Sequence, residues 1–438
     1  MNAPAAELTV LDNGFRVVTV PGGYGSMCAM LFVAAGSRHE SRPTSGAAHL
    51  LEHLFFSGTP RWPSMRAIAA EIDGWGCRFN ALTDKEYTAY FIHGPTERAG
   101  DAVAMLAELI HNATLPAGDL ERERRVVLAE LRTGEDNPRV YCRRLANRAL
   151  YGDTPMGWDS VGSPEVIRSL GRDDLLAFRT ELYVPGQMML ALAGGTDHAS
   201  NCAAAKEHFL AGDGHQPRRP AAVAYAPLEH VVAHRDIRQS HLCLTMPGPT
   251  YRHSEREMFT ARFVNTILGS SMSSRLFTSV RERQGLCYSI RSTLDPASDI
   301  GAFVIFTSTE PAKSDQVTGS IVAEMERLAA DGPTDAELRK ARAITKGTHL
   351  LEREDSSVLA RLSAFELMQR GRISTREEKF AIVDDISAEE VTAAARHWLV
   401  PGELRCALVG PAAAEKVLQA EGSRRAGGSL PAAPWREV

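Results

Sequence analysis

The segment His49-Leu50-Leu51-Glu52-His53 has the residue types and the spacing of one half of a catalytic zinc site. In a helix each residue advances by about 100°, so residues four apart lie one turn apart on the same face. The imidazoles of His49 and His53 could therefore share one metal ion. Glu52 would stand beside that face, where its carboxylate can reach a metal-bound water without being a ligand itself.

An accidental spacing on an amphipathic helix is the alternative, because the chain contains 14 histidines. The motif lies within the apolar stretch GAAHLLEHLFF, so its polar side chains are expected to be largely buried. A buried carboxylate that has no metal, partner or proton is energetically costly. The apolar surroundings therefore favour a metal site.

A catalytic zinc needs a third protein ligand and one open position for water. The run DLERERRVVLAELRTGED is a predicted helix in which Glu123 and Glu130 are seven positions apart. Both fall on the same stripe as Val126 and Val127, which should face the interior. Either glutamate is a candidate ligand on this pattern, and the apolar neighbours of Glu130 favour it.

These residues resemble the inverted-motif zinc metallopeptidases of the pitrilysin and insulinase family, which carry HxxEH and a distant glutamate ligand. The run ERRVVLAEL resembles the family's ligand helix, in which the second glutamate binds zinc. The resemblance implies that His49, His53 and Glu130 hold one zinc ion per chain. It implies that Glu52 activates the zinc-bound water. Glu123 would then hydrogen-bond a ligating histidine and fix its tautomer.

The resemblance continues into the second half of the chain. The segment SSMSSRLFTSVRERQGLCYSI resembles a family segment that carries an arginine and a tyrosine seven residues apart, here Arg281 and Tyr288. In the family these two face the zinc from the opposite half, bind substrate and stabilise the tetrahedral oxyanion. A surface arginine and a core tyrosine are the alternative interpretation of these residues.

A predicted strand at 77–83 matches the family strand that contains Asn80, Ala81 and Thr83. By that resemblance it would accept an extended peptide as an added strand, which requires the substrate to be locally unfolded. The expected function is therefore a zinc-dependent endopeptidase that hydrolyses short or unfolded peptides. The alternative is a non-catalytic structural or assembly subunit with the same fold, and the complete ligand set argues against it.

The elements that must position these residues form two similar halves. Strands and helices follow in the order strand, helix, helix, strand, strand, long helices, and this order recurs after roughly 215 residues. The sequence thus predicts an α+β fold of two homologous halves, each a mainly antiparallel sheet covered by helices. The predicted divisions are a zinc-binding half at 1–211 and a linker at 212–229. A second half at 230–420 carries Arg281 and Tyr288, and a flexible tail follows at 421–438.

Size and family resemblance together predict an assembly of two subunits. Larger family members enclose their substrates between two parts of about this size, so a chain of 438 residues corresponds to half of a clamshell chamber. The chain resembles the short dimeric members of bacteria and those like mitochondrial processing peptidase. A homodimer is favoured because both HLLEH and the Arg281/Tyr288 pair are present, and a heterodimer with a related subunit is the alternative.

Composition excludes several other classes of protein. Charged residues make up 24% of the chain and the formal net charge is -5, which is typical neither of a disordered chain nor of a nucleic-acid binder. No apolar run approaches the roughly 20 residues that span a bilayer. The first residues lack the features of a secretory signal, so we expect a cytoplasmic location. Seven scattered cysteines without CxxC spacing predict buried free thiols, and the role of Cys287 stays open.

Overall fold

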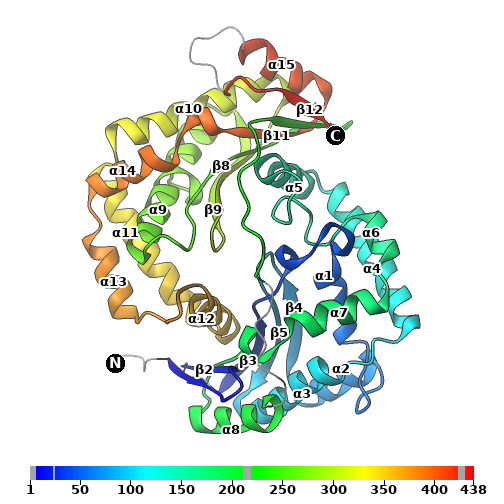
Figure 1. The fold of residues 1–438 in the computed structure, drawn as a ribbon. Helices are drawn as coiled ribbons and strands as arrows, with labels where there is room; N and C mark the ends of the chain where they lie inside the picture. The colour runs from blue at the N-terminus through cyan, green and yellow to red at the C-terminus, as the bar shows by residue number, and fades with distance from the viewer. Residues whose placement is uncertain (1–5, 23–24, 211–218, 423–429) are drawn as a thin grey trace. The chain divides into compact units, whose positions relative to one another are not determined.

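The computed structural model describes residues 6–22, 25–210, 219–422 and 430–438. The chain forms two compact units, each of which contains one six-stranded sheet covered by helices (Figure 1). This arrangement confirms the predicted α+β class. The first unit consists of Met1–Leu131, Asp159–Ala221 and His349–Thr375, and the second of Arg132–Trp158, Ala222–Thr348 and Arg376–Val438.

The sheet of the first unit has the strand order β1-β2-β6-β3-β5-β4. Its neighbours are antiparallel except for the parallel pair β2 and β6. Every residue of β6 is buried, as expected of a central apolar strand, whereas β4 lies at an edge. The strands are β1 Glu7–Val10, β2 Arg16–Pro21, β3 Ser26–Val33, β4 Arg78–Thr83, β5 Thr88–Pro95 and β6 Met188–Gly194.

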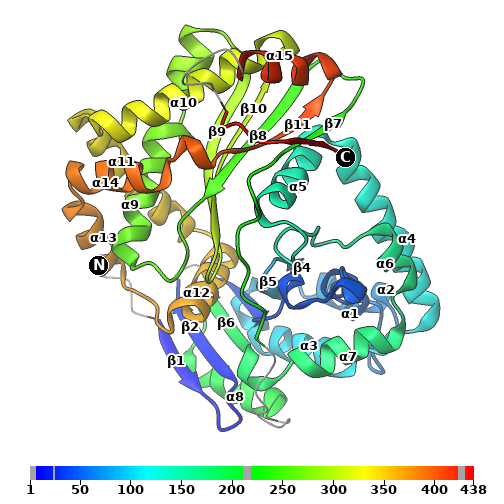
Figure 2. The same cartoon turned by 45° about the horizontal axis from the view of Figure 1, so that its top comes forward.

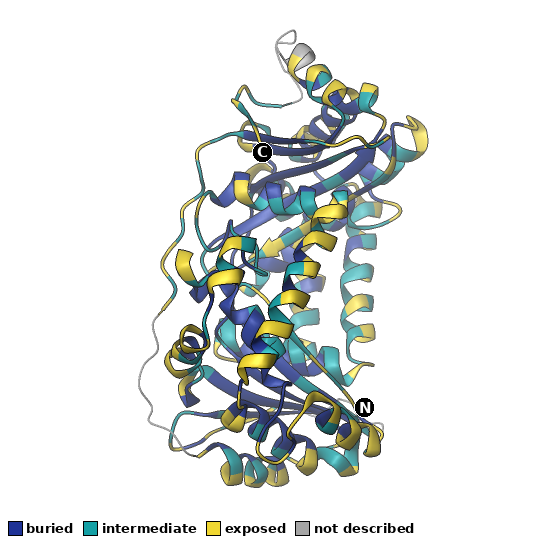
Figure 3. Cartoon of the chain, turned by 90° about the vertical axis from the view of Figure 1, so that its right-hand side faces the viewer, coloured by how far each residue is buried: buried dark blue, intermediate teal, exposed yellow. Residues whose placement is uncertain are grey.

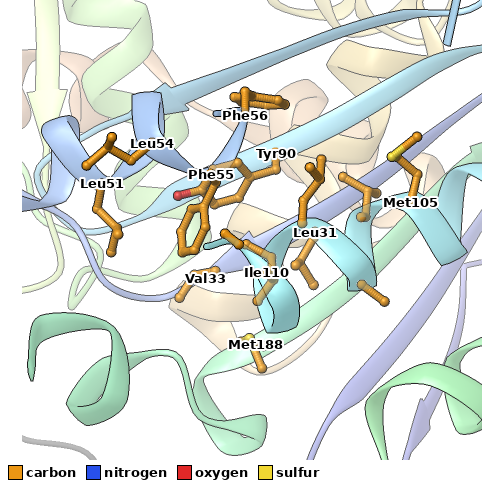
Figure 4. Packing of buried hydrophobic residues seen from close by; sticks show 14 of the residues in the cluster. Leu31, Val33, Leu51, Leu54, Phe55, Phe56, Tyr90, Met105, Ile110 and Met188 are labelled. Carbon is orange, nitrogen blue, oxygen red and sulfur yellow. The ribbon is translucent and has the colours of Figure 1, made fainter. Parts of the chain in front are cut away.

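Helices cover this sheet and enclose the main core of the first unit. Phe55 and Tyr90 lie at its centre, with ring centroids 5.3 Å apart, and Leu31 and Ile110 pack around them (Figure 4). The helices are α1 Ala47–Phe55, α2 Met65–Gly74, α3 Ala99–Asn112, α4 Ala117–Asp136, α6 Pro164–Ser169, α7 Arg172–Leu182 and α8 His198–Phe209.

The sheet of the second unit repeats the topology of the first. Its order is β12-β7-β11-β8-β10-β9, so β7 to β11 take the places that β2 to β6 hold in the first sheet (Figure 2). The predicted internal repeat is therefore visible in the fold. The strands are β7 His230–His234, β8 Ser240–Pro247, β9 Cys287–Pro296, β10 Gly301–Thr309, β11 Arg405–Gly410 and β12 Trp435–Glu437. The helices are α9 Glu255–Asn265, α10 Ser314–Asp331, α11 Asp335–Glu352, α13 Arg376–Asp385, α14 Ala388–Trp398 and α15 Ala412–Gly422.

Each half of the sequence contributes one helix to the other half's sheet. Helix α5, Pro138–Tyr151, packs against β8 and β11 of the second sheet, and α12, Ser356–Arg370, packs against β3 and β6 of the first (Figure 1). The central strands of each sheet are thereby covered and mostly buried (Figure 3), whereas the outer strands β1, β4 and β9 keep exposed residues. The compact units thus combine segments of both halves instead of dividing the chain at one linker.

The C-terminal residues correct part of the predicted flexible tail at 421–438. Strand β12 pairs in parallel with β7, and the Trp435 ring lies 4.9 Å from that of His230. The small residues that precede Trp435 suggested a frayed end, but a sheet edge beside β7 supplies hydrogen-bond partners for an added strand. Residues 423–429 of the tail and 212–218 of the predicted linker lie outside the described residues, and 219–229 form neither helix nor strand.

None of the described helices combines the length and the apolar character needed to cross a membrane.

Candidate metal centre

The start of α1 is fixed by a glycine and a buried carboxylate. Gly46 precedes the helix with φ 94°, and a Cβ there would lie 2.6 Å from the Val161 carbonyl oxygen, so only glycine fits. The backbone N–H groups of Gly46 and Ala48 both donate to Glu40 at 2.8 Å. Glu40 therefore satisfies two N–H groups that a helix start leaves free, and burial raises its pKa to about 8. The sequence pattern did not indicate this role.

Helix α1 buries its apolar face in the core and leaves its histidines on the other side. Leu51, Leu54 and Phe55 point into the packed interior (Figure 4). His49 and His53 are only partly buried, and their ring centroids are 4.8 Å apart. The predicted i, i+4 arrangement of the two imidazoles is thus present.

The third residue of the cluster comes from α4. The Glu130 Oε2 atom lies 3.7 Å from His49 Nε2 and 3.8 Å from His53 Nε2. All three ligand atoms lie within 4.8 Å of one another, and within the described ranges this is the one group of histidine, cysteine and carboxylate residues that could hold a metal. The two distances to Glu130 suit atoms that each stand about 2 Å from a shared zinc ion.

The protonation of the histidines fits metal binding. His53 Nδ1 donates to Glu123 Oε2 at 3.1 Å, which leaves the lone pair of Nε2 facing Glu130. Burial, and secondarily the nearby His53, lowers the pKa of His49 to about 4, so its imidazole is neutral as a ligand must be. The Glu130 side chain is 45% exposed, which leaves one side of the cluster open to water. Two imidazoles and a carboxylate with an open side fit a catalytic zinc ion.

The packing of α4 corrects one detail of the predicted stripe. Val127 is fully buried, but Val126 is 40% exposed. Neighbouring residues on a helix differ by about 100° in direction, so two adjacent valines cannot both face the core. The buried residues of α4 are instead Leu120, Val127 and Leu131.

Glu52 is partly buried, and its carboxylate is hydrogen-bonded to the edge strand β4. Burial raises the pKa of Glu52, and the hydrogen bond that Thr83 Oγ1 donates to Glu52 Oε2 acts in the opposite direction. Thr83 therefore contacts Glu52 directly, which the sequence pattern did not indicate. Asn80 is exposed on the same strand, and its Oδ1 accepts the N–H of Ala81 at 2.9 Å.

Arg281 and Tyr288 lie together in the second unit, whereas the histidine cluster lies in the first. Both line one pocket of about 290 Å³. Tyr288 is 77% exposed, so the alternative interpretation as a core tyrosine is wrong. The Arg281 guanidinium lies 4.4 Å from the centre of the Phe277 ring. All seven cysteines are free, and burial raises the pKa of Cys287, which keeps it a thiol.

Comparison with known proteins agrees with this geometry. The family model "Insulinase (Peptidase family M16)" matches residues 21–161, and "Peptidase M16 inactive domain" matches 169–345. An uncharacterized zinc protease of Mycobacterium leprae is 34% identical over 420 residues, which cover 94% of this chain and 93% of the relative. Mitochondrial-processing peptidase subunit beta of Bos taurus is 27% identical over 425 residues, which cover 94% and 85%.

A solved structure shows the same fold. The crystal structure of a protease from Helicobacter pylori matches with a TM-score of 0.86 at 22% identity, covering 93% of this chain and all of that one. The Mycobacterium leprae relative is similar to this chain over nearly the whole length of both proteins. This similarity and the match to the insulinase model assign the family. The chain belongs to the insulinase family, peptidase family M16.

Proposed function

We propose that this chain is a zinc-dependent endopeptidase that hydrolyses short or unfolded peptides. The observation that carries the proposal is the convergence of His49 Nε2, His53 Nε2 and Glu130 Oε2, with the partly buried Glu52 on the same helix as the two histidines. Zinc bound by these three residues would polarise the scissile carbonyl and lower the pKa of a bound water. Relatives that are named zinc proteases support the proposal.

Of the residues around the cluster, Glu52 transfers protons, and Thr83 and Glu123 position other side chains. Glu52 accepts a proton from the attacking water and later gives it to the leaving amine. Its raised pKa eases the first step, because a more basic carboxylate takes the proton from the water more readily. Thr83 orients the Glu52 carboxylate, and Glu123 holds His53 in the tautomer that leaves Nε2 free.

We propose that the substrate peptide binds along β4. This strand is at the edge of its sheet and has a paired neighbour only in β5 among the described strands. An extended peptide could add to it by backbone hydrogen bonds, with Asn80 and Ala81 next to the peptide and Thr83 next to Glu52. Recognition through the backbone favours flexible peptides over folded proteins.

We also propose that two subunits complete each active site. Only the first half carries HxxEH, and in the family that the chain resembles an arginine and a tyrosine face the zinc from the opposite half of the chamber. We therefore assign Arg281 and Tyr288 of a partner chain to the substrate and the oxyanion. A homodimer is the simplest such assembly. The alternative is a dimer with a related but different chain, because one relative is named as a subunit, mitochondrial-processing peptidase subunit beta.

Replacement of Glu52 by Gln tests the catalytic proposal. The variant should retain about one zinc per chain, because the ligands are unchanged, and should lose hydrolysis of a flexible fluorogenic peptide, because the proton acceptor is gone. Glu121→Gln on α4 is a suitable control, since this side chain is 65% exposed and pairs with Arg124. If Glu52→Gln hydrolysed the peptide at the wild-type rate, the general base would have to be another residue.

Mixing two inactive variants tests the shared site. Glu52→Gln and Arg281→Ala homodimers should each be nearly inactive, and a mixed dimer should regain one of its two sites. With random subunit exchange about half of the dimers are mixed, so about a quarter of wild-type activity is expected. Exchange without recovered activity would show that Arg281 does not act across subunits.

A non-catalytic subunit is the second candidate. The family model that matches residues 169–345 is described as an inactive domain, which fits the absence of HxxEH from the second half. The matched first half retains the whole cluster. A zinc content near none in the purified chain would favour the non-catalytic candidate.

A further inference from the structure

The pocket that contains Arg281 and Tyr288 is positively charged. Arg139 and Arg291 line it as well, and no acidic residue does. Three arginines therefore line one space of about 290 Å³ in the second unit.

Three different elements bring these arginines together. Arg139 lies in the first turn of α5, and its guanidinium stands 4.9 Å from the centre of the Phe306 ring. Arg291 on β9 is the register partner of Phe306 on β10, so the two side chains share one face of the sheet. Arg281 comes from the π-helical turn Phe277–Arg283 and lies over Phe277. Figure 2 shows α5, β9 and β10 within the second unit.

The charges of this pocket are not neutralised within the described part of the chain. Arg139, Arg281 and Arg291 make no ion pair there, whereas the nearby Arg143 is paired with Asp295. Like charges that share a pocket repel one another, and contact with aromatic rings offsets only part of that cost. An anionic group that enters the pocket would relieve the repulsion.

The chemistry of the pocket suits a carboxylate, which is the anionic group that a peptide carries. Guanidinium groups bind carboxylates through paired hydrogen bonds, and stacking on aromatic rings holds them in fixed orientations. The exposed phenol of Tyr288 offers a further donor. We propose that this pocket binds a carboxylate of the substrate peptide, from an Asp or Glu side chain or from the C-terminus, and so selects peptides that carry a negative charge at one position. That the ligand is a peptide rests on the proposed function.

Binding to the inactive Glu52→Gln protein tests the proposal without turnover. The probes are three fluorescent peptides of one sequence: one with an internal Glu and an amidated C-terminus, one with Gln in its place, and one with Gln and a free C-terminal carboxylate. Fluorescence anisotropy gives each Kd. Loss of the recognised carboxylate should weaken binding about 10- to 100-fold, since hydrogen bonds to charged groups are the strong ones. The arm that retains tight binding identifies a side chain or the C-terminus as the source.

Two variants and a matched control assign the effect to the pocket. In the Glu52→Gln background, Arg139→Gln and Arg291→Gln should each reduce the discrimination between charged and neutral peptides to a few-fold. Arg262→Gln should leave it intact, because Arg262 also lies over a phenylalanine, 5.6 Å from the Phe259 ring, but does not line the pocket. Circular dichroism on all three variants checks that they fold.

Equal Kd values for all three peptides would overturn the proposal. So would discrimination that survives in both pocket variants as it does in Arg262→Gln. The failure of the proposed function looks different, because a chain without zinc or hydrolysis could still discriminate between the peptides through this pocket.

Discussion

Replacing Glu123 by Gln should weaken zinc binding without removing a ligand. The Glu123 carboxylate accepts a hydrogen bond from His53 Nδ1 at 3.1 Å, and its side chain is only 16% exposed. That bond keeps the proton on Nδ1 and makes Nε2 a better donor to the metal. Gln can still accept the bond but carries no charge, so the loss concerns electrostatics and not shape.

The size of the effect follows from the contact. Removing such a supporting partner typically costs 10- to 100-fold in metal affinity, which corresponds to about 1.4 to 2.7 kcal/mol. Because Glu123 also accepts from the exposed Arg122 Nε at 3.1 Å, part of its charge is already compensated. We therefore expect the lower end of the range, a zinc Kd about ten times that of the wild type.

Competition with a chromophoric zinc chelator measures both dissociation constants under the same conditions. Glu121→Gln on the same helix serves as the control and should bind zinc as the wild type does, because its side chain is 65% exposed. An unchanged Kd for Glu123→Gln would refute the role of the hydrogen bond. Complete loss of zinc in Glu123→Gln, with zinc retained in Glu130→Gln, would make Glu123 the ligand in place of Glu130.

Three further substitutions test other contacts. Thr83→Val removes the hydrogen bond to Glu52 and should lower kcat about tenfold at unchanged zinc content, measured by steady-state kinetics and metal analysis. Gly46→Ala should destabilise the fold by at least about 1 to 3 kcal/mol in urea unfolding, since φ 94° and a carbonyl oxygen at 2.6 Å exclude a Cβ. Burial works to raise the pKa of Glu337, but its bonds to Arg275 hold it at about 2, below the ordinary 4.5. The stabilisation from this lowered pKa is present above about pH 4.5 and is lost as the pH falls toward 2. Glu337→Gln should therefore lower the free energy of unfolding by about 1 kcal/mol at pH 7, allowing for solvent screening, and by less at pH 3. An unchanged kcat in Thr83→Val would contradict the contact with Glu52. A Gly46→Ala protein as stable as the wild type would contradict the steric argument. For Glu337→Gln, the contradicting result is a loss of unfolding free energy that is the same at pH 7 and pH 3.

The chemistry-bearing motif and the repeat could be predicted because both are periodic. HLLEH fixes two imidazoles by helix geometry alone, and the order of strands and helices recurs in the second half. The approach of Glu130 to these histidines depends on how α4 packs. The sequence pattern does not show this packing, so it could only favour Glu130 over Glu123 as the ligand. The family resemblance favoured Glu130, and its Oε2 lies within 3.8 Å of both imidazoles.

Contacts between distant segments could not be predicted from local patterns. No local pattern marks Glu40 as the carboxylate at the start of α1, and nothing near Arg139 indicates that it lines a pocket with Arg291. The exchange of α5 and α12 between the two sheets was missed for the same reason, because an apolar helix face does not specify which sheet it covers. Such choices are made by tertiary packing.

An anomalous difference map collected at the zinc absorption edge tests the central claim most directly. In crystals of the protein as purified, we predict one strong peak per chain, about 2.0 to 2.2 Å from His49 Nε2, His53 Nε2 and a carboxylate oxygen of Glu130. The position would identify the ligands without reference to activity. No peak in crystals grown with added zinc, or a peak bound by other residues, would contradict the account.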